Sequence, residues 1–254
     1  MDVGQGDAIL VTTNNHAILV DAGPPTMGDS LVRYLRRHSV SHLDFVIATH
    51  PHADHIGGLS TLFAEKSVDT LLCAYHPHTT QTYENYVAAA KHAHIPRVAA
   101  RRGDSYHREN LHIEILHPDT LWGSLNNGSV VARLSIGAHT MLLTGDAEKE
   151  VEEELLKHTP DALYAPVLKV GHHGSNSSST HEFLAAVAPR IALIQCGKNS
   201  PYGHPHPRAL RRIHATGADI FSTAQHGSIR LKGVPHNRWR LIPEHPYPPL
   251  EPLP

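Results

Sequence analysis

The chain has 254 residues, 40% hydrophobic and 18% charged, which is the composition of an ordinary globular protein with a sizeable core. It contains no run of about 20 apolar residues that could span a bilayer, and no apolar signal segment opens it. The net charge of −2 does not indicate a nucleic-acid-binding protein, although the 24 histidines predict a strongly positive surface in mild acid.

The first part of the chain reads as a hairpin, a helix and a strand. Two short apolar runs, 8–11 and 17–20, flank a turn and predict a hairpin that ends at Asp21. Apolar residues at helical spacing after Ser30 predict a helix. A buried strand at 45–48 follows and ends in a cluster of histidines.

The second part repeats this order. Apolar runs at 130–134 and 140–143 predict a hairpin that ends at Asp146, a helix from about 147 to 158 follows, and a strand at 167–170 ends in two histidines. The repeat predicts two similar sheets packed face to face with helices outside, and strand ends that meet at one edge. The alternative is the chance alternation found in any α/β chain.

The other predicted elements connect and extend these two halves. They are a helix at 81–93, a strand at 111–116, a helix near 182–187, a strand at 191–196, a helix near 207–216 and two closing strands. The last ten residues are half proline and indicate an extended tail or a linker stump.

The histidine cluster has the pattern His50-x-His52-x-Asp54-His55 and is followed by two glycines. Imidazole nitrogens and carboxylate oxygens are the ligands that bind Zn²⁺ or Mn²⁺ in proteins. Other H-x-H pairs lack an adjoining acidic residue and a preceding buried strand, which makes them weaker candidates; they are His76-Pro77-His78, His92-Ala93-His94 and His204-Pro205-His206.

From Thr49 to His55 the chain matches every fixed position of T-H-x-H-x-D-H, and it thereby resembles the metallo-β-lactamase superfamily. This resemblance implies an α/β fold, an αββα sandwich of two packed mixed β-sheets with helices on the outer faces. We accordingly assign residues 1–240 to a metallo-β-lactamase-like hydrolase domain and 241–254 to a Pro-rich C-terminal tail.

The resemblance also implies two divalent metal ions, Zn²⁺ or Mn²⁺. It implies the following ligands: His50 and His52 for one metal, Asp54, His55 and His173 for the other, and Asp146 as a bridge between them. Asp21 would orient a ligand rather than bind metal. Such a pair of metals suits phosphodiester hydrolysis, and amide or thioester hydrolysis is also within its reach.

One position departs from the superfamily pattern. Where a further histidine usually precedes the second hairpin, this chain has Asn126 and Asn127, and His117 lies too early to take that place. The first metal would then lack one protein ligand, and Asn126, Asn127 or water would fill the gap. Because an amide oxygen is a harder and weaker ligand than imidazole, Mn²⁺ becomes plausible beside Zn²⁺.

Further motifs narrow the resemblance to the C-terminal hydrolase domain of ComEC, the inner-membrane DNA-uptake channel of competent bacteria. In chain order they are D-V-G-Q-G-D-A from Asp2, N-N-G-S from Asn126, L-K-V-G-H-H-G-S from Leu168 and Y-G-H-P from Tyr202. The resemblance implies a nuclease that degrades the non-transforming strand during natural competence. It also implies DNA, especially single-stranded DNA, and the rest of the channel as partners, with the domain on the periplasmic or extracellular side.

On this interpretation Asp54, His172 and His204 act in catalysis. His172 or His204 would contact the scissile phosphate or protonate the leaving oxygen, and the alternative for each is a supporting or surface histidine. Three arginine clusters, at 97–102, 208–212 and 230–240, are candidate DNA contacts or ordinary solvated charge. Two other functions stay open: a small-molecule phosphodiesterase or esterase, and a non-catalytic DNA-binding module.

Overall fold

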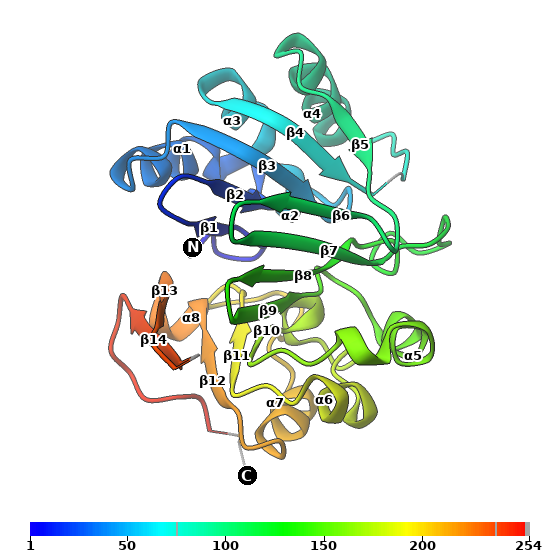
Figure 1. Cartoon of the computed structure of the whole chain (residues 1–254), viewed down its shortest axis with the longest axis vertical. Coiled ribbons are helices and arrows are strands. Elements are labelled where there is room, and N and C mark those ends of the chain that lie inside the picture. The colour runs from blue at the N-terminus through cyan, green and yellow to red at the C-terminus, as the bar shows by residue number, and fades with distance from the viewer. Residues whose placement is uncertain (75, 237, 252–254) are drawn as a thin grey trace.

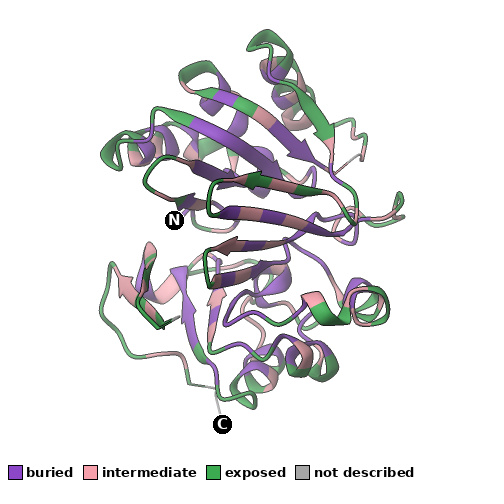
Figure 2. Ribbon diagram, in the orientation of Figure 1, coloured by how far each residue is buried: buried purple, intermediate pink, exposed green. Residues whose placement is uncertain are grey.

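The computed structural model describes residues 1–74, 76–236 and 238–251. Two β-sheets lie face to face, and helices cover the outer face of each (Figure 1). The predicted αββα sandwich is therefore confirmed. Most strand residues in the middle of the sandwich are buried, whereas each helix exposes one side to solvent (Figure 2).

The first sheet contains five strands, and only its first pair is antiparallel. Across the sheet they are β1 (Ile9–Thr12), β2 (Ala17–Val20), β3 (His42–Ala48), β4 (Ser67–Cys73) and β5 (Arg97–Ala99). Every residue of β3 after the first is buried, because a parallel central strand is covered on both faces.

The second sheet contains seven strands. Across the sheet they are β12 (Asp219–Ser222), β11 (Ile191–Ile194), β10 (Val167–Lys169), β9 (His139–Leu143), β8 (Val131–Ile136), β7 (Leu111–His117) and β6 (Ser105–Arg108). Strands β9 to β12 are parallel, and β6 to β9 are antiparallel. A separate hairpin is formed by β13 (Ile229–Val234) and β14 (Arg238–Pro243).

Helices follow the strands on both sides of the sandwich. On the first sheet lie η1 (Pro25–Met27), α1 (Gly28–Arg37), α2 (Ala53–Ile56), α3 (Leu59–Glu65) and α4 (Gln81–His92). With the second sheet lie α5 (Lys149–His158), η2 (Pro160–Ala162), η3 (Gly171–Gly174), α6 (His181–Val187), α7 (Pro207–His214) and α8 (Thr223–His226). The Thr80 and Thr180 hydroxyls accept N-cap hydrogen bonds at the starts of α4 and α6.

Three apolar clusters correspond to the three interfaces between layers. One joins the first sheet to its helices, and one joins the second sheet to its helices. The third lies between the sheets and contains Ile18, Phe45 and Ile47 from the first sheet with Ile113 and Leu134 from the second. This last cluster fixes the position of one sheet against the other, and with it the edge where their strand ends meet.

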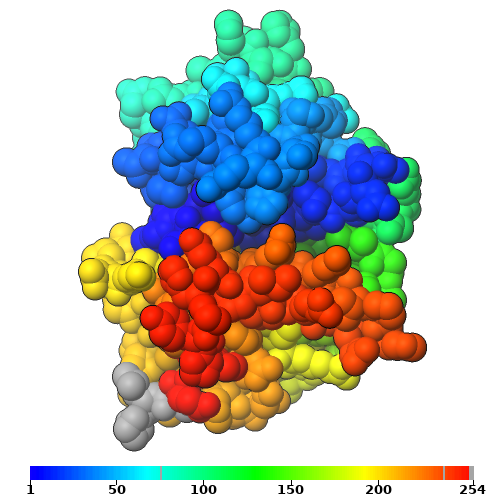
Figure 3. Space-filling view, turned by 90° about the vertical axis from the view of Figure 1, so that its left-hand side faces the viewer, coloured from blue at the N-terminus to red at the C-terminus, as the bar shows by residue number. Residues whose placement is uncertain are grey.

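The C-terminal segment runs over the outside of the second half. Figure 3 shows it as a red band beside the orange part of the chain, below the blue N-terminal part. The Leu250 amide donates to the Ile220 carbonyl at 2.8 Å, which ties this segment to β12. β14 extends to Pro243, and the division at residue 240 stays a prediction. No helix in the described part of the chain is long and apolar enough to cross a membrane.

Candidate metal centre

The two histidine motifs come together at the carboxyl ends of strands in both sheets. The loop after β3 carries His50 and His52, and α2 directly after it carries Asp54 and His55. The loop after β9 carries Asp146, and η3 after β10 carries His173. The ligand atoms of His50, His52 and Asp146 lie within 4.8 Å of one another, and so do those of Asp54, His55 and His173. The structure thus brings together all six residues expected to bind metal.

Asp146 lies between the two groups of ligands. Its Oδ2 is 3.7 Å from His50 Nε2, 3.3 Å from His55 Nε2 and 3.4 Å from His173 Nε2. Asp54 Oδ2 lies 3.3 Å from His173 Nε2. Asp146 is 2% exposed and Asp54 is partly exposed, so the carboxylate between the groups is the less accessible one.

The hydrogen bonds around this centre suit a bound cation. His55 Nδ1 donates to Asp21 Oδ2 at 2.7 Å, and His173 Nδ1 donates to the Gln195 carbonyl at 2.8 Å. In the neutral rings the Nε2 atoms therefore carry lone pairs, yet they face each other at 3.3 Å. Asp146 Oδ1 is buried and has no hydrogen-bond partner in the described structure. Electron-pair donors that converge without a hydrogen between them fit a divalent cation.

Asp21 is completely buried and holds both His55 and the start of the metal loop. Its Oδ1 accepts from the Thr49 amide at 2.8 Å, and its Oδ2 accepts from the Thr49 hydroxyl at 2.7 Å. Together with the bond from His55, these contacts fix the tautomer and the direction of that ring. Asp21 thus lies where a residue that orients a ligand would lie.

Asn126 and Asn127 differ in their surroundings. Both polar atoms of the Asn127 amide are engaged, because Oδ1 accepts from the Glu148 amide at 3.0 Å and Nδ2 donates to Glu150 at 3.2 Å. Asn126 Oδ1 is buried without a partner, and its Nδ2 lies 3.4 Å from His172 Nε2. Asn126 is therefore the better candidate for the position of the missing histidine.

The charges of the centre favour added positive charge. Burial opposes a proton on His55, but Asp146 and Asp21 outweigh it and raise the pKa of His55 well above its usual value. For His173, burial is likewise outweighed by Asp146, and the pKa rises. Burial and the neighbouring His55 lower the pKa of His50 well below its usual value. A bound divalent cation would take the place of the protons that Asp146 and Asp21 otherwise stabilise on the His55 imidazole and that Asp146 stabilises on the His173 imidazole.

His172 and His204 line the same region without belonging to either group of ligands. His172 Nε2 lies 4.0 Å from Asp146 Oδ2, and its Nδ1 lies 3.1 Å from Glu148 Oε1. The His204 ring is centred 5.4 Å from that of His172 and 6.3 Å from that of His173. Burial, followed by the charges of His172 and His173, lowers the pKa of His204 to about 4.

The backbone is unusual at several of these positions. His172 and His173 have φ angles of 46° and 53°, a left-handed conformation that costs free energy for residues with a side chain. A Cβ at Gly6 would collide with the Asp54 carbonyl, which only glycine avoids at this close approach. The N-terminal motif therefore packs directly on the metal loop.

Three buried residues of the centre had no role that could be assigned from the sequence. Asp7 Oδ2 pairs with Lys169 Nζ at 2.8 Å, and Asp7 Oδ1 lies 3.4 Å from His173 Nδ1. Ser129 Oγ accepts from the Asp146 amide at 3.0 Å and lies 3.3 Å from His50 Nδ1. The sequence contained a sign of the role of Lys169, because it is the one charged residue in the apolar run of β10.

Three of the arginines in these clusters make contacts inside the fold. Arg97 lies over the Tyr86 ring, and Arg102 pairs with Asp119 at 2.7 Å. Arg212 donates to the Ser178 and Ser179 carbonyls. The side chains of Arg230, Arg238 and Arg240 are exposed on β13 and β14.

The chain is similar to several bacterial proteins about three times its length. It is 31% identical to ComE operon protein 3 of Bacillus subtilis, over 91% of this chain and 32% of that protein. It is 32% identical to Recombination protein 2 of Haemophilus influenzae, over 91% and 28%. It is 31% identical to Competence protein ComA of Neisseria gonorrhoeae, over 91% and 31%. The chain thus spans about a third of the length of these relatives.

Solved structures share the fold at low sequence identity. The metallo-beta-lactamase fold protein YhfI from Bacillus subtilis matches with a TM-score of 0.59 and 16% identity, over 86% of this chain and 88% of that one. CmlA, a diiron beta-hydroxylase from Streptomyces venezuelae, matches with a TM-score of 0.55 and 12% identity, over 86% and 51%. Since a diiron beta-hydroxylase shares this scaffold, the fold by itself does not decide the reaction.

A family model described as the metallo-beta-lactamase superfamily matches residues 1–198, which include both halves of the repeat and every expected metal ligand. The similarity to competence proteins confirms the narrower resemblance to ComEC. Because one superfamily pattern accounts for both sheets and for the edge where their histidines converge, the chain belongs to the metallo-beta-lactamase superfamily.

Proposed function

We propose that this protein is a metal-dependent nuclease that hydrolyses DNA phosphodiester bonds and degrades the non-transforming strand during DNA uptake. The observation that carries the proposal is the position of Asp146, whose carboxylate lies within 4 Å of histidines from both groups of ligands. A carboxylate shared in this way would allow two cations to act on one phosphodiester.

The proposed ligands follow from the two groups. One cation would be held by His50, His52 and Asp146, with Asn126 as the candidate further ligand, and the other by Asp54, His55, His173 and the same Asp146. When bound, Zn²⁺ or Mn²⁺ would lower the pKa of a shared water and neutralise charge on the phosphate. The chain's own contribution is to orient the imidazoles through Asp21, Gln195 and Ser129.

His172 and His204 would contact the substrate. In the neutral ring, His172 Nδ1 carries the hydrogen and donates a hydrogen bond to Glu148 Oε1. Nε2 is then the ring nitrogen that lies toward Asp146. In the protonated ring Nε2 also carries a hydrogen, which it can donate to a phosphate oxygen or to the leaving oxygen. With its pKa lowered to about 4, His204 is neutral near pH 7 and would serve as a hydrogen-bonding group rather than as a cation.

The names of the relatives support DNA as the substrate. Two of them refer to competence and to recombination, and similarity extends over 91% of this chain. Because the chain covers about a third of each relative, we propose that its partner is the remainder of a membrane-embedded DNA-uptake channel, with this domain on the periplasmic or extracellular side.

The test is turnover of defined substrates. Purified protein is supplied with Mn²⁺ or Zn²⁺ and given linear single-stranded DNA, circular single-stranded DNA and a generic phosphodiester. We expect DNA cleavage, and cleavage of the circle would identify an endonuclease. Turnover of the small ester but never of DNA would favour the phosphodiesterase alternative, and salt-sensitive DNA binding without turnover in any metal would favour the binding module.

Two matched pairs of variants make the assay specific. Asp54→Ala should abolish turnover, whereas Asp69→Ala, which removes an exposed carboxylate of β4, should not. His172→Ala should lower turnover by about 100-fold or more, the usual contribution of one acid or base. His92→Ala, at the exposed end of α4, is its control. Full activity of Asp54→Ala would mean that the metal assignment is wrong.

A further inference from the structure

The hairpin of β13 and β14 carries four basic side chains on one face, which we call the cationic face. Lys232 lies directly opposite Arg240, and Arg230 and Arg238 each lie two positions earlier on the same strand. Residues that are opposite each other, or two apart along a strand, point to the same side of an antiparallel pair. All four residues are exposed. The hairpin therefore concentrates positive charge on one side of a chain whose net charge is −2.

The opposite face of the hairpin packs on the rest of the molecule. Its half-buried side chains include those of Leu231, Trp239 and Leu241. The Trp239 ring packs edge-on against that of His139, with the centroids 4.9 Å apart. His139 Nε2 also lies 3.1 Å from the Val234 carbonyl and 3.1 Å from the Arg238 carbonyl. A hairpin held in this way keeps its cationic face turned to solvent.

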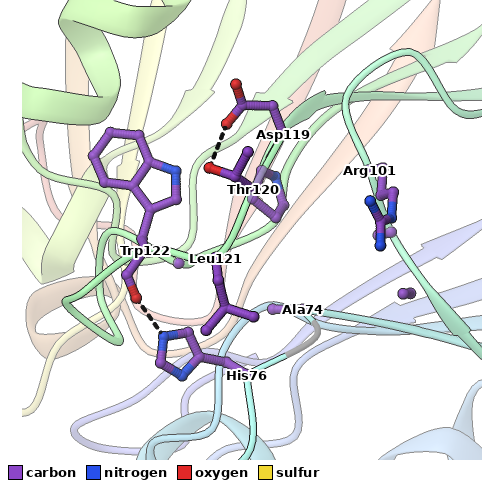
Figure 4. Close-up of a pocket in the computed structure, with 11 residues that line it drawn as sticks. Ala74, His76, Arg101, Asp119, Thr120, Leu121 and Trp122 are labelled. Carbon is purple, nitrogen blue, oxygen red and sulfur yellow. Dashed lines mark hydrogen bonds between the residues drawn. The ribbon is translucent and has the colours of Figure 1, made fainter.

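No partner within the described part of the chain neutralises the cationic face. None of its four side chains forms an ion pair or a side-chain hydrogen bond with another described residue, whereas Arg102 pairs with Asp119 at 2.7 Å. Arg101, of the same arginine cluster as Arg102, lines a pocket together with that carboxylate (Figure 4). Like charges directly opposite each other on a sheet are destabilising, so Lys232 and Arg240 repel each other until an anion binds beside them.

The surroundings of the hairpin add positive charge. Burial raises the pKa of the Tyr34 hydroxyl against the opposing charges of Arg230 and Arg37, so both guanidinium groups lie near this ring. Figure 1 and Figure 3 show α1, which carries Arg37, on the same side of the molecule as the hairpin. The one carboxylate between residues 228 and 244 is that of Glu244, which follows β14 and accepts from the Ser228 amide at 3.0 Å.

The chemistry of the cationic face favours the phosphates of a DNA duplex. Three of its four cations are arginines, whose planar guanidinium groups bind phosphate through two parallel hydrogen bonds. A two-stranded β-ribbon fits the major groove of B-DNA, which is about 12 Å wide. Surfaces that bind a bilayer add exposed apolar side chains to their cations, and those that bind single strands add exposed aromatic rings. The described residues of this face expose neither, because Trp239 belongs to the opposite face.

The hairpin begins at a short distance from the metal centre. Ser228 Oγ accepts from the Asp2 amide at 3.1 Å, and the Asp7 amide donates to the Asp54 carbonyl at 3.2 Å. Because the chain from Asp2 to Asp7 spans at most about 18 Å, Ser228 lies within about 25 Å of the Asp54 carbonyl. That distance is the length of about seven base pairs. A duplex bound at the hairpin therefore needs only a short continuation to bring a strand to the metal centre.

We propose that the cationic face binds the phosphate backbone of double-stranded DNA and holds the duplex beside the metal centre, whatever its base sequence. Contacts to phosphate fix the position of a duplex but do not read its bases. The hairpin lies outside residues 1–198, the part of the chain that the superfamily model matches, so the shared fold does not account for it. This inference rests on the proposed nuclease function, and the experiments below separate the failure of one from the failure of the other.

The first experiment measures binding without turnover. With metal removed by EDTA, fluorescence anisotropy follows the binding of a labelled duplex of about 30 base pairs, which is longer than the reach from the hairpin to the centre. Lys232→Gln combined with Arg240→Gln should make the slope of log K against log salt about 1.8 less steep, since each phosphate contact contributes about 0.9. Lys91→Gln combined with Arg190→Gln removes the same charges from exposed positions on α4 and before β11, and should bind as the wild type does.

Three results of this experiment would overturn the proposal. They are an unchanged salt slope in the Lys232 and Arg240 variant, tighter wild-type binding of a single strand than of the duplex, and binding to phosphatidylglycerol vesicles without binding to the duplex. The last two would assign the cationic face to single strands or to a membrane surface. Urea unfolding checks that the variant is folded, and its stability should not fall, because the substitutions remove a repulsion between opposite strands.

The second experiment uses turnover. Wild-type protein should cleave a single-stranded tail joined to a duplex handle about tenfold more efficiently than the same tail alone, measured as kcat/KM at low salt. In the Lys232 and Arg240 variant this ratio should fall toward unity, and in the Lys91 and Arg190 variant it should persist. An equal ratio in the wild type and the Lys232 and Arg240 variant contradicts the inference. Duplex binding that depends on the cationic face, without any DNA cleavage, would instead contradict the nuclease function and leave the docking surface standing.

Discussion

Replacement of Asp21 by asparagine tests how the centre orients its ligands. The two residues have nearly the same shape, but the amide has one acceptor oxygen where the carboxylate has two. If that oxygen keeps the bond from the Thr49 amide, the NH₂ group faces His55 Nδ1. His55 must then present a lone pair at Nδ1 and carry its hydrogen on Nε2, the atom that faces Asp146 at 3.3 Å.

The magnitude follows from this change of tautomer. A hydrogen on Nε2 has to be removed before the ring can bind metal, and loss of such a supporting contact usually weakens metal affinity by about 10- to 100-fold. That corresponds to about 1.4–2.8 kcal/mol of binding free energy. The metal-free protein should change less, because burial raises the pKa of Asp21 and its charge is itself costly.

Calorimetric titration of the EDTA-stripped protein with Zn²⁺ and with Mn²⁺ measures the affinity directly. Asp161→Asn, an exposed carboxylate at η2, is the matched control and should bind as the wild type does. Thermal melts without metal show whether the Asp21→Asn variant is folded. Wild-type affinity in a folded Asp21→Asn protein would refute the reasoning, since Asp21 would then have no influence on the ring of His55.

Three further predictions concern other parts of the site. Asn126→His should supply a third imidazole and raise the metal content per chain toward two, as measured by elemental analysis; an unchanged content would place Asn126 outside the centre. Lys169→Met leaves Asp7 buried without its 2.8 Å partner and should cost about 3–5 kcal/mol in urea unfolding. For His204, whose pKa falls from 6.5 to about 4 on folding through burial and the charge of His172, the unfolded chain binds the proton first. The contribution of neutral His204 to the free energy of unfolding should therefore be complete above pH 6.5 and be lost as the pH falls toward 4. Urea unfolding across this pH range should show a smaller loss of stability in His204→Gln than in the wild type.

Local patterns were sufficient for most of the fold. The period of apolar residues predicted α4, α5 and α6 and the two hairpins close to their observed ends, because helix and strand repeats are written in neighbouring residues. Strands β5 and β6 were not predicted. They are short, border their sheets and alternate with polar or charged side chains, so their sequences resemble loops.

The candidate site divides in the same way. The motif from His50 to His55 carries the superfamily resemblance, and that resemblance was sufficient to propose the six ligands. The difference between Asn126 and Asn127 was not accessible, since it depends on which amide meets Glu148 and Glu150 of another segment.

The sequence by itself thus determined the types of ligand, the superfamily and the two halves of the repeat. Only the tertiary structure decided which buried groups remain without partners, such as Asp146 Oδ1 and Asn126 Oδ1. The physical reason is that a motif specifies side chains along one segment. Hydrogen-bond satisfaction and cavity shape are set by how two sheets pack through their shared apolar layer, which brings residues more than 100 positions apart into contact.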